Sequence, residues 1–269
     1  MSARPCVLTI AGSDSGGGAG IQADLKTFMA HRCYGASVVT ALTAQNTRGV
    51  TGIHAPEPGF VALQLRTVLE DIPVAAAKTG MLFSAAIVEA VAAGLERKRF
   101  PLVVDPVCIS QSGHALLKGD ALDALRRRML PLADLATPNR PEAEALTGMA
   151  VTDRESLLAV LEKLLSFGPR AVLLKGGHME ARDGELIDWL ALPGQEPEPL
   201  PVPQVDTPHT HGTGCALSAA IAARLARGEA LRDAVRGAQT FLNRALVAGF
   251  AVGRGASPPD HLADFGESC

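Results

Sequence analysis

Cysteine is scarce in this sequence, and its few cysteines lie far apart. The five of them stand at positions 6, 33, 108, 215 and 269, an odd number with no Cys-x-x-Cys pair. Zinc sites and disulfide frameworks need closely spaced or evenly paired cysteines, so this pattern argues against both. We therefore expect reduced thiols in a cytoplasmic protein.

Long apolar runs and a surplus of charge of one sign are also missing. The sequence has no stretch of about 18 apolar residues without a charge, so we expect neither a membrane-spanning segment nor a membrane partner. We expect no signal peptide either, because Arg4 and Pro5 precede only a short apolar run. The formal net charge is −3, which argues against nucleic acid as the main partner.

The sequence does have a large apolar fraction, arranged in two alternating patterns. Hydrophobic residues make up 47% of the 269 residues, which is enough for a sizeable core. Short apolar runs predict strands at 7–10, 37–42, 74–78, 102–105, 171–175 and 186–192, the last of them antiparallel. Helical spacing predicts helices at 21–28, 61–70, 85–95, 122–130, 142–146, 157–165, 214–226 and 231–248.

Strands that alternate with helices predict an α/β fold, with a mostly parallel central sheet and helices on both faces. No repeat or linker divides the chain, so we expect one domain over residues 1–269, with its core between about 5 and 250. The proline-rich stretch 193–203 predicts an exposed connection. We expect the tail 257–269 to be loosely ordered.

Ligand sites in open α/β sheets form at the carboxyl ends of the strands. The residues that follow the predicted strands are 12–20, 43–47, 79–81, 105–107 and 175–177, and the loop 207–215 joins them. The first of these loops is rich in glycine, yet it fits neither common phosphate-binding pattern. The dinucleotide pattern needs glycine where Ile21 stands, and a P-loop needs glycine where Leu25 precedes Lys26.

The run His211-Gly212-Thr213-Gly214-Cys215 leads directly into a predicted helix. The first amides of a helix lack partners within it, and the helix dipole adds positive charge, so this loop suits an anion such as phosphate. The same field is expected to lower the pKa of the Cys215 thiol. An ordinary helix start with a buried cysteine is the alternative interpretation.

Seven sequence blocks follow one another between residue 7 and about residue 249. They are Ala11 to Thr27, Thr40 to Thr47, Lys78 to Met81, Asp105 to Val107, Thr137 to Ala143, Leu174 to His178 and Thr210 to Cys215. In this order they resemble the hydroxymethylpyrimidine/phosphomethylpyrimidine kinases, the thiamine-pathway members of the ribokinase-like superfamily. The resemblance implies a ribokinase-like three-layer sandwich, with ATP and Mg²⁺ as cofactors. It also implies a cytoplasmic homodimer that phosphorylates the hydroxymethyl group of 4-amino-5-hydroxymethyl-2-methylpyrimidine and then the resulting monophosphate.

The resemblance also assigns the phosphate chemistry to particular residues. Gly212, Thr213 and Gly214 would offer backbone amides as an anion hole for the transferred phosphoryl group. Cys215 would be the general base for the substrate hydroxyl; alternatively it packs against the substrate, with solvent or a phosphate oxygen as the base. Lys175 would compensate phosphate charge, unless it is an ordinary lysine at a strand end.

Nucleotide and metal contacts follow from the same resemblance. Asn139 and Thr207 join Lys175 as expected nucleotide contacts. Glu142, in the pattern Asn-x-x-Glu, and Asp105 are the expected Mg²⁺ residues; Mg²⁺ usually keeps several waters and takes one or two carboxylates. Glu142 is also suited to the first turn of a helix, where a carboxylate interacts favourably with the dipole.

Gln45 is the expected reader of the pyrimidine. Its carboxamide presents a donor and an acceptor on one edge, which matches a ring nitrogen beside an exocyclic amine. The other expected substrate contacts are Gly12, Ala19, Asp24, Met81 and Val107. Taken alone, Met81 would be a core residue and Asp24 a solvent-facing helix residue.

Three other functions stay open at the level of sequence. A pyridoxal or pyridoxine kinase would use the same scaffold and a flat hydroxymethyl acceptor, although Gln45 and Met81 favour the pyrimidine. A cysteine hydrolase would pair Cys215 with a nearby histidine, but no supporting aspartate or asparagine loop accompanies them. A non-catalytic vitamin-binding module would have no use for phosphate-binding groups.

Overall fold

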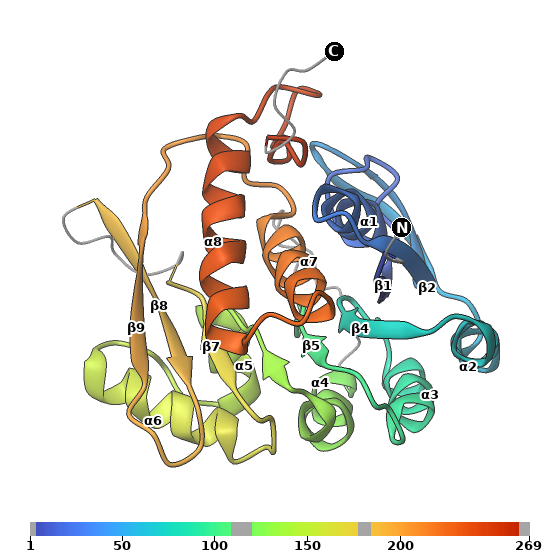
Figure 1. Ribbon diagram of the computed structural model, residues 1–269, viewed down its shortest axis with the longest axis horizontal. Helices are drawn as coiled ribbons and strands as arrows, with labels where there is room; N and C mark the ends of the chain where they lie inside the picture. The colour runs from blue at the N-terminus through green and yellow to red at the C-terminus, as the bar shows by residue number, and fades with distance from the viewer. Residues whose placement is uncertain (1–3, 109–119, 177–183, 264–269) are drawn as a thin grey trace.

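The computed structural model describes residues 4–108, 120–176 and 184–263. Within these ranges nine strands form one sheet in the order β3-β2-β1-β4-β5-β6-β7-β8-β9 (Figure 1). The strands are β1 (Cys6–Gly12), β2 (Tyr34–Asn46), β3 (Gly49–His54), β4 (Val74–Thr79), β5 (Leu102–Val104), β6 (Leu135–Ala136), β7 (Val172–Leu174), β8 (Glu185–Ala191) and β9 (Glu198–Pro203). Six strands, β1, β2 and β4 to β7, pair in parallel, while β3, β8 and β9 pair antiparallel at the two ends. The predicted mostly parallel sheet is confirmed, as is the antiparallel strand at 186–192.

Each predicted helix is present, with small changes at its ends. The helices are α1 (Gly20–Ala30), α2 (Pro58–Asp71), α3 (Ala85–Leu95), α4 (Ala121–Ala124), α5 (Arg140–Thr147), α6 (Arg154–Leu165), α7 (Thr213–Ala226) and α8 (Leu231–Val247). Two irregular helical turns, η1 (Leu125–Met129) and η2 (Leu130–Leu132), continue α4. Among the described residues, no helix combines the length and apolar character that crossing a bilayer requires.

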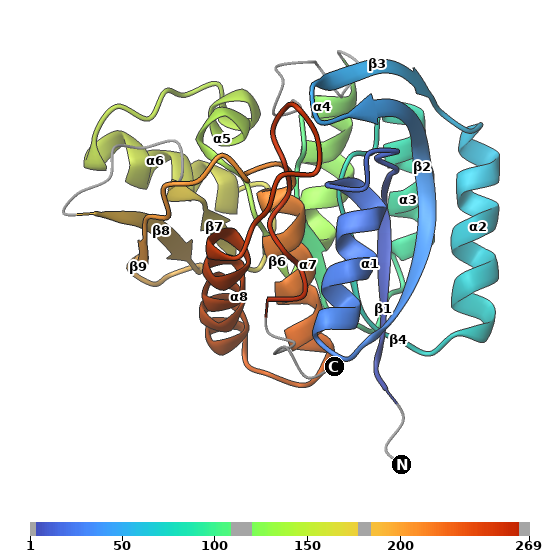
Figure 2. The same ribbon diagram turned by 90° about the horizontal axis from the view of Figure 1, so that it is seen from above.

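The sheet separates two apolar layers, because successive side chains of a strand point to opposite faces. Leu8 and Ile10 of β1 pack into the layer with helices α2 to α6. Val7 packs on the other face with α1, α7 and α8. Figure 1 shows these two sets of helices on either side of the sheet, and Figure 2 shows the same arrangement from above. The expected three-layer arrangement is therefore present.

Helix α7 is the most enclosed of these helices and fixes the position of the loop before it. It lies on the sheet between α1 and α8, and residues 216–223 are all buried. Small side chains let the helix backbone approach the sheet closely, which explains the alanine-rich sequence after Cys215. The loop that precedes α7 is thus held at the carboxyl edge of the parallel strands.

The structure corrects the prediction of an exposed connection at 193–203, because Glu198–Pro203 forms the edge strand β9. The N–H of Gln204 donates to the carbonyl of Gly184, so the N–H groups of every second residue before it also point toward β8. The prolines occupy the positions in between, where an N–H group would point away from β8 and would have no strand to bind; they are Pro199, Pro201 and Pro203. Proline at alternate positions of an edge strand therefore leaves the pairing intact.

The tail is better ordered than predicted. Ser257 and His261 are buried, and the N–H of His211 donates to the carbonyl of Ser257 at 3.1 Å. The expectation of a loose tail is therefore wrong for residues 257–263. Residues 264–269 lie outside the described part of the chain, as do Gly177 and His178 of the sixth block.

Candidate active site

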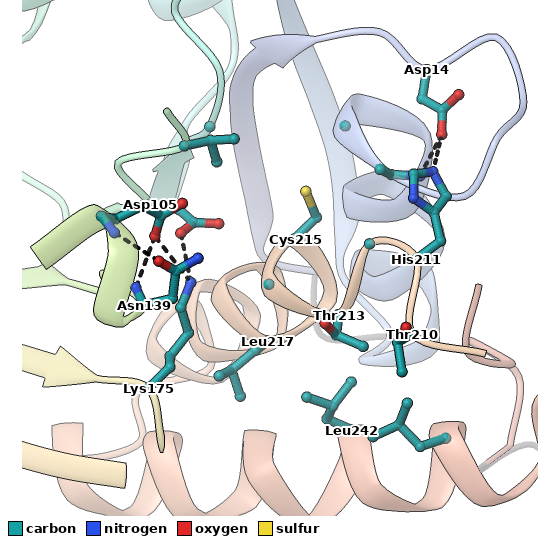
Figure 3. Close-up of a pocket in the computed structure, with 18 of the residues that line it drawn as sticks. Asp14, Asp105, Asn139, Lys175, Thr210, His211, Thr213, Cys215, Leu217 and Leu242 are labelled. Carbon is teal, nitrogen blue, oxygen red and sulfur yellow. Dashed lines mark hydrogen bonds and ion pairs between the residues drawn. The ribbon is translucent and has the colours of Figure 1, made fainter. Parts of the chain in front are cut away.

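A cavity of about 820 Å³ lies at the carboxyl ends of the parallel strands (Figure 3). Its walls come from the loops after β1, β4, β5, β6 and β7 and from the start of α7. Nearly all of the predicted site residues line it: Gly12, Ala19, Gln45, Met81, Asp105, Val107, Asn139, Glu142, Lys175, Thr207, Gly212, Thr213, Gly214 and Cys215. The exception is Asp24.

The phosphate loop, residues 210–215, forms the N-terminal end of α7. Gly212 is the N-cap residue, with a φ of +80°, and none of the described side chains caps the helix there. A side chain on Gly212 would collide with the carbonyl oxygen of Gly18, so glycine is required for conformation and for space. Gly212, Thr213 and Gly214 all line the cavity at this N-terminal end of α7, which is where an anion-binding role requires backbone amides.

Cys215 stands on the first turn of α7, partly exposed, between the groups around Asp105 and those around His211 (Figure 3). Burial raises the pKa of its thiol to about 11, although the positive charge of Lys78 and the N–H of Gly20 act in the opposite direction. This direction is opposite to the lowering expected from the helix N-terminus, because desolvation disfavours the thiolate more than Lys78 and the N–H of Gly20 favour it.

A charged cluster occupies the neighbouring wall of the cavity. Lys175 Nζ lies 3.0 Å from Asp105 Oδ1 and 3.8 Å from Glu142 Oε2, and all three side chains are largely buried. Burial raises the pKa of Glu142 to about 7, against the lowering effect of Lys175. Burial alone would lower the pKa of Lys175, but the two carboxylates raise it, so the lysine stays charged. Gly214 lets this cation approach α7, since a Cβ there would lie 3.3 Å from Nζ.

Asn139 and Glu142 also cap the start of α5. The N–H of Glu142 donates to Asn139 Oδ1 at 2.8 Å, and the N–H of Asn139 donates to Glu142 Oε2 at 2.8 Å. This reciprocal pair is a capping box, which satisfies two donors that the helix itself leaves free. Glu142 therefore has the structural role expected of a carboxylate in the first turn of a helix. It also lines the cavity, as binding of Mg²⁺ would require.

The donor set fits Mg²⁺ better than it fits a fully protein-coordinated ion. Asp105 and Glu142 bring carboxylate oxygens to one wall, and Asn139 adds an amide. Among the described residues, no group of three or more histidine, cysteine, aspartate or glutamate side chains could hold a metal ion. Mg²⁺ commonly takes one or two carboxylates and keeps waters, so two acidic residues suffice.

A carboxamide and an apolar surface also line the cavity, at Gln45 and at Met81 with Val107. At the cavity wall, Thr43 Oγ1 lies 3.2 Å from Gln45 Oε1 and 2.8 Å from the carbonyl oxygen of Ser13. Met81 belongs to a small apolar cluster with Ala41 and Val107, so it is both a packing residue and a wall of the cavity. A flat ring between this apolar wall and the carboxamide would find shape and polarity complementary to its own.

Asp24 does not occupy the place predicted for it. Its side chain is fully buried, and its two oxygens lie 2.8 and 2.9 Å from Lys78 Nζ. Thr9 Oγ1 donates to the same carboxylate at 2.6 Å. Asp24 therefore neither faces solvent nor lines the cavity; it keeps Lys78, which does line it, in the charged state. The two residues are 54 positions apart, so their pairing leaves no local signal in the sequence.

Two further groups at the cavity were missed by the sequence analysis. Asp188 accepts the N–H of Gly176 at 2.6 Å and the amide of Gln239 at 2.7 Å. A lone carboxylate inside the apolar strand 186–192 is a signal that could have revealed it. The second is the pairing of His211 with Asp14, whose Oδ2 atom lies 2.9 Å from His211 Nε2 (Figure 3).

Comparisons with known proteins agree with this geometry. The family model described as phosphomethylpyrimidine kinase matches residues 14–260. The hydroxymethylpyrimidine/phosphomethylpyrimidine kinase of Streptomyces coelicolor is 49% identical over 263 residues, covering 98% of this chain and 96% of that protein. The thiamine biosynthesis bifunctional protein ThiED of Geobacter sulfurreducens is 50% identical over 260 residues, covering 96% of this chain and 52% of that protein.

A solved structure supports the fold independently. The ADP complex of Bacillus subtilis pyridoxal kinase superposes with a TM-score of 0.88 at 34% identity, covering 98% of this chain and 99% of that one. This likeness confirms the expected ribokinase-like architecture. With the family match over most of its length, the chain belongs to the phosphomethylpyrimidine kinase family.

Proposed function

We propose that this chain transfers the γ-phosphoryl group of ATP to the hydroxymethyl group of 4-amino-5-hydroxymethyl-2-methylpyrimidine, and then phosphorylates the monophosphate, in thiamine biosynthesis. The observation that supports this best is the convergence of three groups in one cavity of about 820 Å³. These are the phosphate loop, the cluster around Lys175 and the acceptor wall with Gln45. Family membership supplies the substrate class.

Transfer of a phosphoryl group depends mainly on alignment and on stabilising negative charge. The amides of Gly212, Thr213 and Gly214 would hold the transferred group, and Lys175 would neutralise its charge. Asn139 and Thr207 would contact the nucleotide, while Asp105 and Glu142 would hold Mg²⁺. When bound, the ion would neutralise phosphate charge. Since both carboxylates also contact Lys175, that lysine would shift from them toward the phosphates.

Cys215 lies between the two ends of the cavity, where the reacting hydroxyl would sit. We assign it as the general base, with Lys78 as the cation that favours the thiolate. The raised pKa of the thiol keeps the thiolate population small at neutral pH. In the alternative role, Cys215 packs against the acceptor and a phosphate oxygen takes the proton.

Acceptor recognition would fall to Gln45, with Gly12, Ala19, Met81 and Val107 as the surrounding wall. The Gln45 carboxamide would pair with a ring nitrogen and the exocyclic amine of the pyrimidine. Pyridoxal is the second candidate acceptor, because a pyridoxal kinase shares this fold at a TM-score of 0.88. Its pyridine ring lacks the amine beside a ring nitrogen that Gln45 would read.

The test is ADP production by the purified protein with ATP and Mg²⁺. Four reactions are compared: hydroxymethylpyrimidine, its monophosphate, pyridoxal and no acceptor. We expect turnover with both pyrimidines and a clearly lower kcat/KM for pyridoxal. Pyridoxal as the best acceptor would overturn the assignment of Gln45, and tight pyrimidine binding without ADP would indicate a binding module.

The proposal also covers the oligomeric state and the cellular location of the protein. We expect a homodimer in the cytoplasm, as the family resemblance implies. Sedimentation velocity at micromolar concentration measures the mass directly. A monomer at all concentrations would contradict the dimer without touching the kinase assignment.

A further inference from the structure

Asp14 organises the glycine loop, residues 12–20, from within. Its carboxylate accepts the N–H groups of Gly16 at 2.8 Å, Gly18 at 3.1 Å and Ala19 at 2.9 Å. The side chain is almost fully buried. Bonds from several amides to one carboxylate fix a loop that glycine would otherwise leave free to adopt many conformations.

The same carboxylate reaches across to the phosphate loop. His211 Nε2 lies 2.9 Å from Asp14 Oδ2, although the two residues are 197 positions apart. The His211 backbone is held as well, because its N–H donates to the carbonyl of Ser257. In Figure 3 this pair stands beside the start of α7, on the side of Cys215 opposite the Asp105 cluster. The buried Asp14 carboxylate thus binds three amides of the glycine loop and the His211 side chain of the phosphate loop.

Close packing of the backbones reinforces this connection. A Cβ on Gly212 would collide with the carbonyl oxygen of Gly18. A Cβ on Gly18 would lie 2.5 Å from the Cδ2 atom of His211. The two loops are therefore in direct contact at the pair, and displacement of one requires displacement of the other.

Each loop belongs to a different part of the proposed reaction. Ser15 of the glycine loop binds the Gln45 backbone, accepting its N–H at 2.8 Å and donating to its carbonyl at 2.7 Å. The Gln45 Nε2 atom lies 3.4 Å from His211 Nε2. On the other side, His211 is followed immediately by Gly212, Thr213 and Gly214. The pair thus lies between the residue that would read the acceptor and the amides that would hold the phosphoryl group.

We infer that Asp14 and His211 are positioning residues, whose pairing sets the distance between the acceptor and the phosphate loop. This inference rests on the proposed kinase function. Neither side chain transfers a proton or touches the phosphoryl group in this scheme. Because phosphoryl transfer requires in-line alignment, a looser connection lowers kcat while nucleotide affinity changes little.

The first test is hydrogen–deuterium exchange of the free protein, which requires no activity. Asp14→Asn and His211→Ala are each expected to speed exchange in both loops, including the loop that is not altered. Asp134→Asn is the matched control, since Asp134 also accepts a backbone N–H, at 2.9 Å from Leu102, and pairs with Lys98. Asp134 does not line the cavity. Faster exchange confined to the altered loop would overturn the inference.

The second test is kinetic and uses wild-type turnover as its reference. Each single variant is expected to lower kcat by about ten- to a hundredfold, with KM for ATP within about threefold of wild type. His211→Gln, which keeps a donor near the Nε2 position, is expected to retain more activity than His211→Ala. The double variant should be no slower than the worse single variant. Fully additive losses, or a large rise in KM for ATP alone, would contradict the pairing, whereas an inactive wild-type protein would contradict the kinase proposal instead.

Discussion

At the scale of single residues, the site depends on how burial acts on charge. Cys215 gains a higher pKa on burial, while Lys78 and Lys175 keep their charge because carboxylates lie within 3.0 Å of each ammonium. Burial of an ion is tolerated only where a partner compensates the lost hydration. The cavity wall therefore keeps two charged lysines, each beside at least one carboxylate.

Replacing the thiol tests the chemical role of Cys215. Cys215→Ala is expected to lower kcat by at least about a hundredfold, with little change in KM for the pyrimidine, because a base acts only in the transition state. Steady-state kinetics across pH measures this. If Cys215 only packs against the acceptor, the variant keeps most of its kcat and loses the pyrimidine affinity instead.

The substitution Gln45→Ala tests whether the Gln45 carboxamide recognises the pyrimidine. Loss of a bidentate contact is expected to cost about 1–3 kcal/mol of pyrimidine binding, seen as a higher KM, while ATP affinity is unchanged. Titration calorimetry with the pyrimidine and with a non-hydrolysable ATP analogue separates the two effects. An unchanged pyrimidine affinity would remove Gln45 from the acceptor site.

The buried pair of Lys78 and Asp24 makes a prediction about stability. Lys78→Met leaves the Asp24 carboxylate buried without its cation, so we expect a loss of about 3–5 kcal/mol of unfolding free energy. Urea denaturation measures this loss. Arg66→Ala is the control, since Arg66 and Glu70 form an exposed pair and its loss is expected to cost at most about 0.5 kcal/mol. Equal effects of the two substitutions would contradict the account.

At the scale of elements, the sequence predicted what depends on local patterns. Continuous apolar runs identified β1, β4 and β7, and glycine before a helix located the phosphate loop. β6 was missed because two residues, Leu135–Ala136, show no periodicity. β9 was missed because a proline-rich sequence is typical of a loop. Its prolines are compatible with a strand only because β9 is an edge strand that pairs with β8 alone. The pairs Asp24–Lys78 and Asp14–His211 were missed because tertiary structure alone brings them together.

The two capping boxes allow a matched test of the start of α5. Asn139 caps α5 beside the cavity, while Asp153 caps α6 at an exposed position. Asn139→Ala and Asp153→Ala are each expected to lower the unfolding free energy by about 1 kcal/mol. Only the change at Asn139 is expected to raise KM for ATP, because only that cap lies at the charged cluster. A similar KM change in both variants would contradict this role.

At the scale of the whole molecule, the last described segment, residues 257–263, contacts the phosphate loop through the bond from the His211 N–H to the Ser257 carbonyl. His261 is buried, and its Nε2 atom has no hydrogen-bond partner among the described residues. Burial, with Lys26 nearby, lowers its pKa from 6.5 to about 4. The folded protein therefore favours the neutral form of the His261 imidazole.

The sign of the resulting pH dependence follows from linkage. Between pH 6.5 and about 4 the unfolded chain binds a proton at His261 that the folded protein does not, so stability falls as pH falls. The expected loss is up to about 1.4 kcal/mol for each pKa unit of the shift. Urea midpoints at pH 7 and pH 4.5 measure it. His261→Gln should reduce the difference between them, and His54→Gln, at an exposed position of β3, should not; equal pH dependence in all three proteins would contradict the assignment.

In the proposed reaction the acceptor wall, the phosphate loop and the charged cluster act together on one small molecule. The most direct measurement is mass spectrometry of the products formed from hydroxymethylpyrimidine with ATP and Mg²⁺, alone and in an equimolar mixture with pyridoxal. We predict first the monophosphate and then the diphosphate, each formed with one ADP. Consumption of ATP with an unchanged pyrimidine, or phosphorylation of pyridoxal in preference to it, would contradict the central claim.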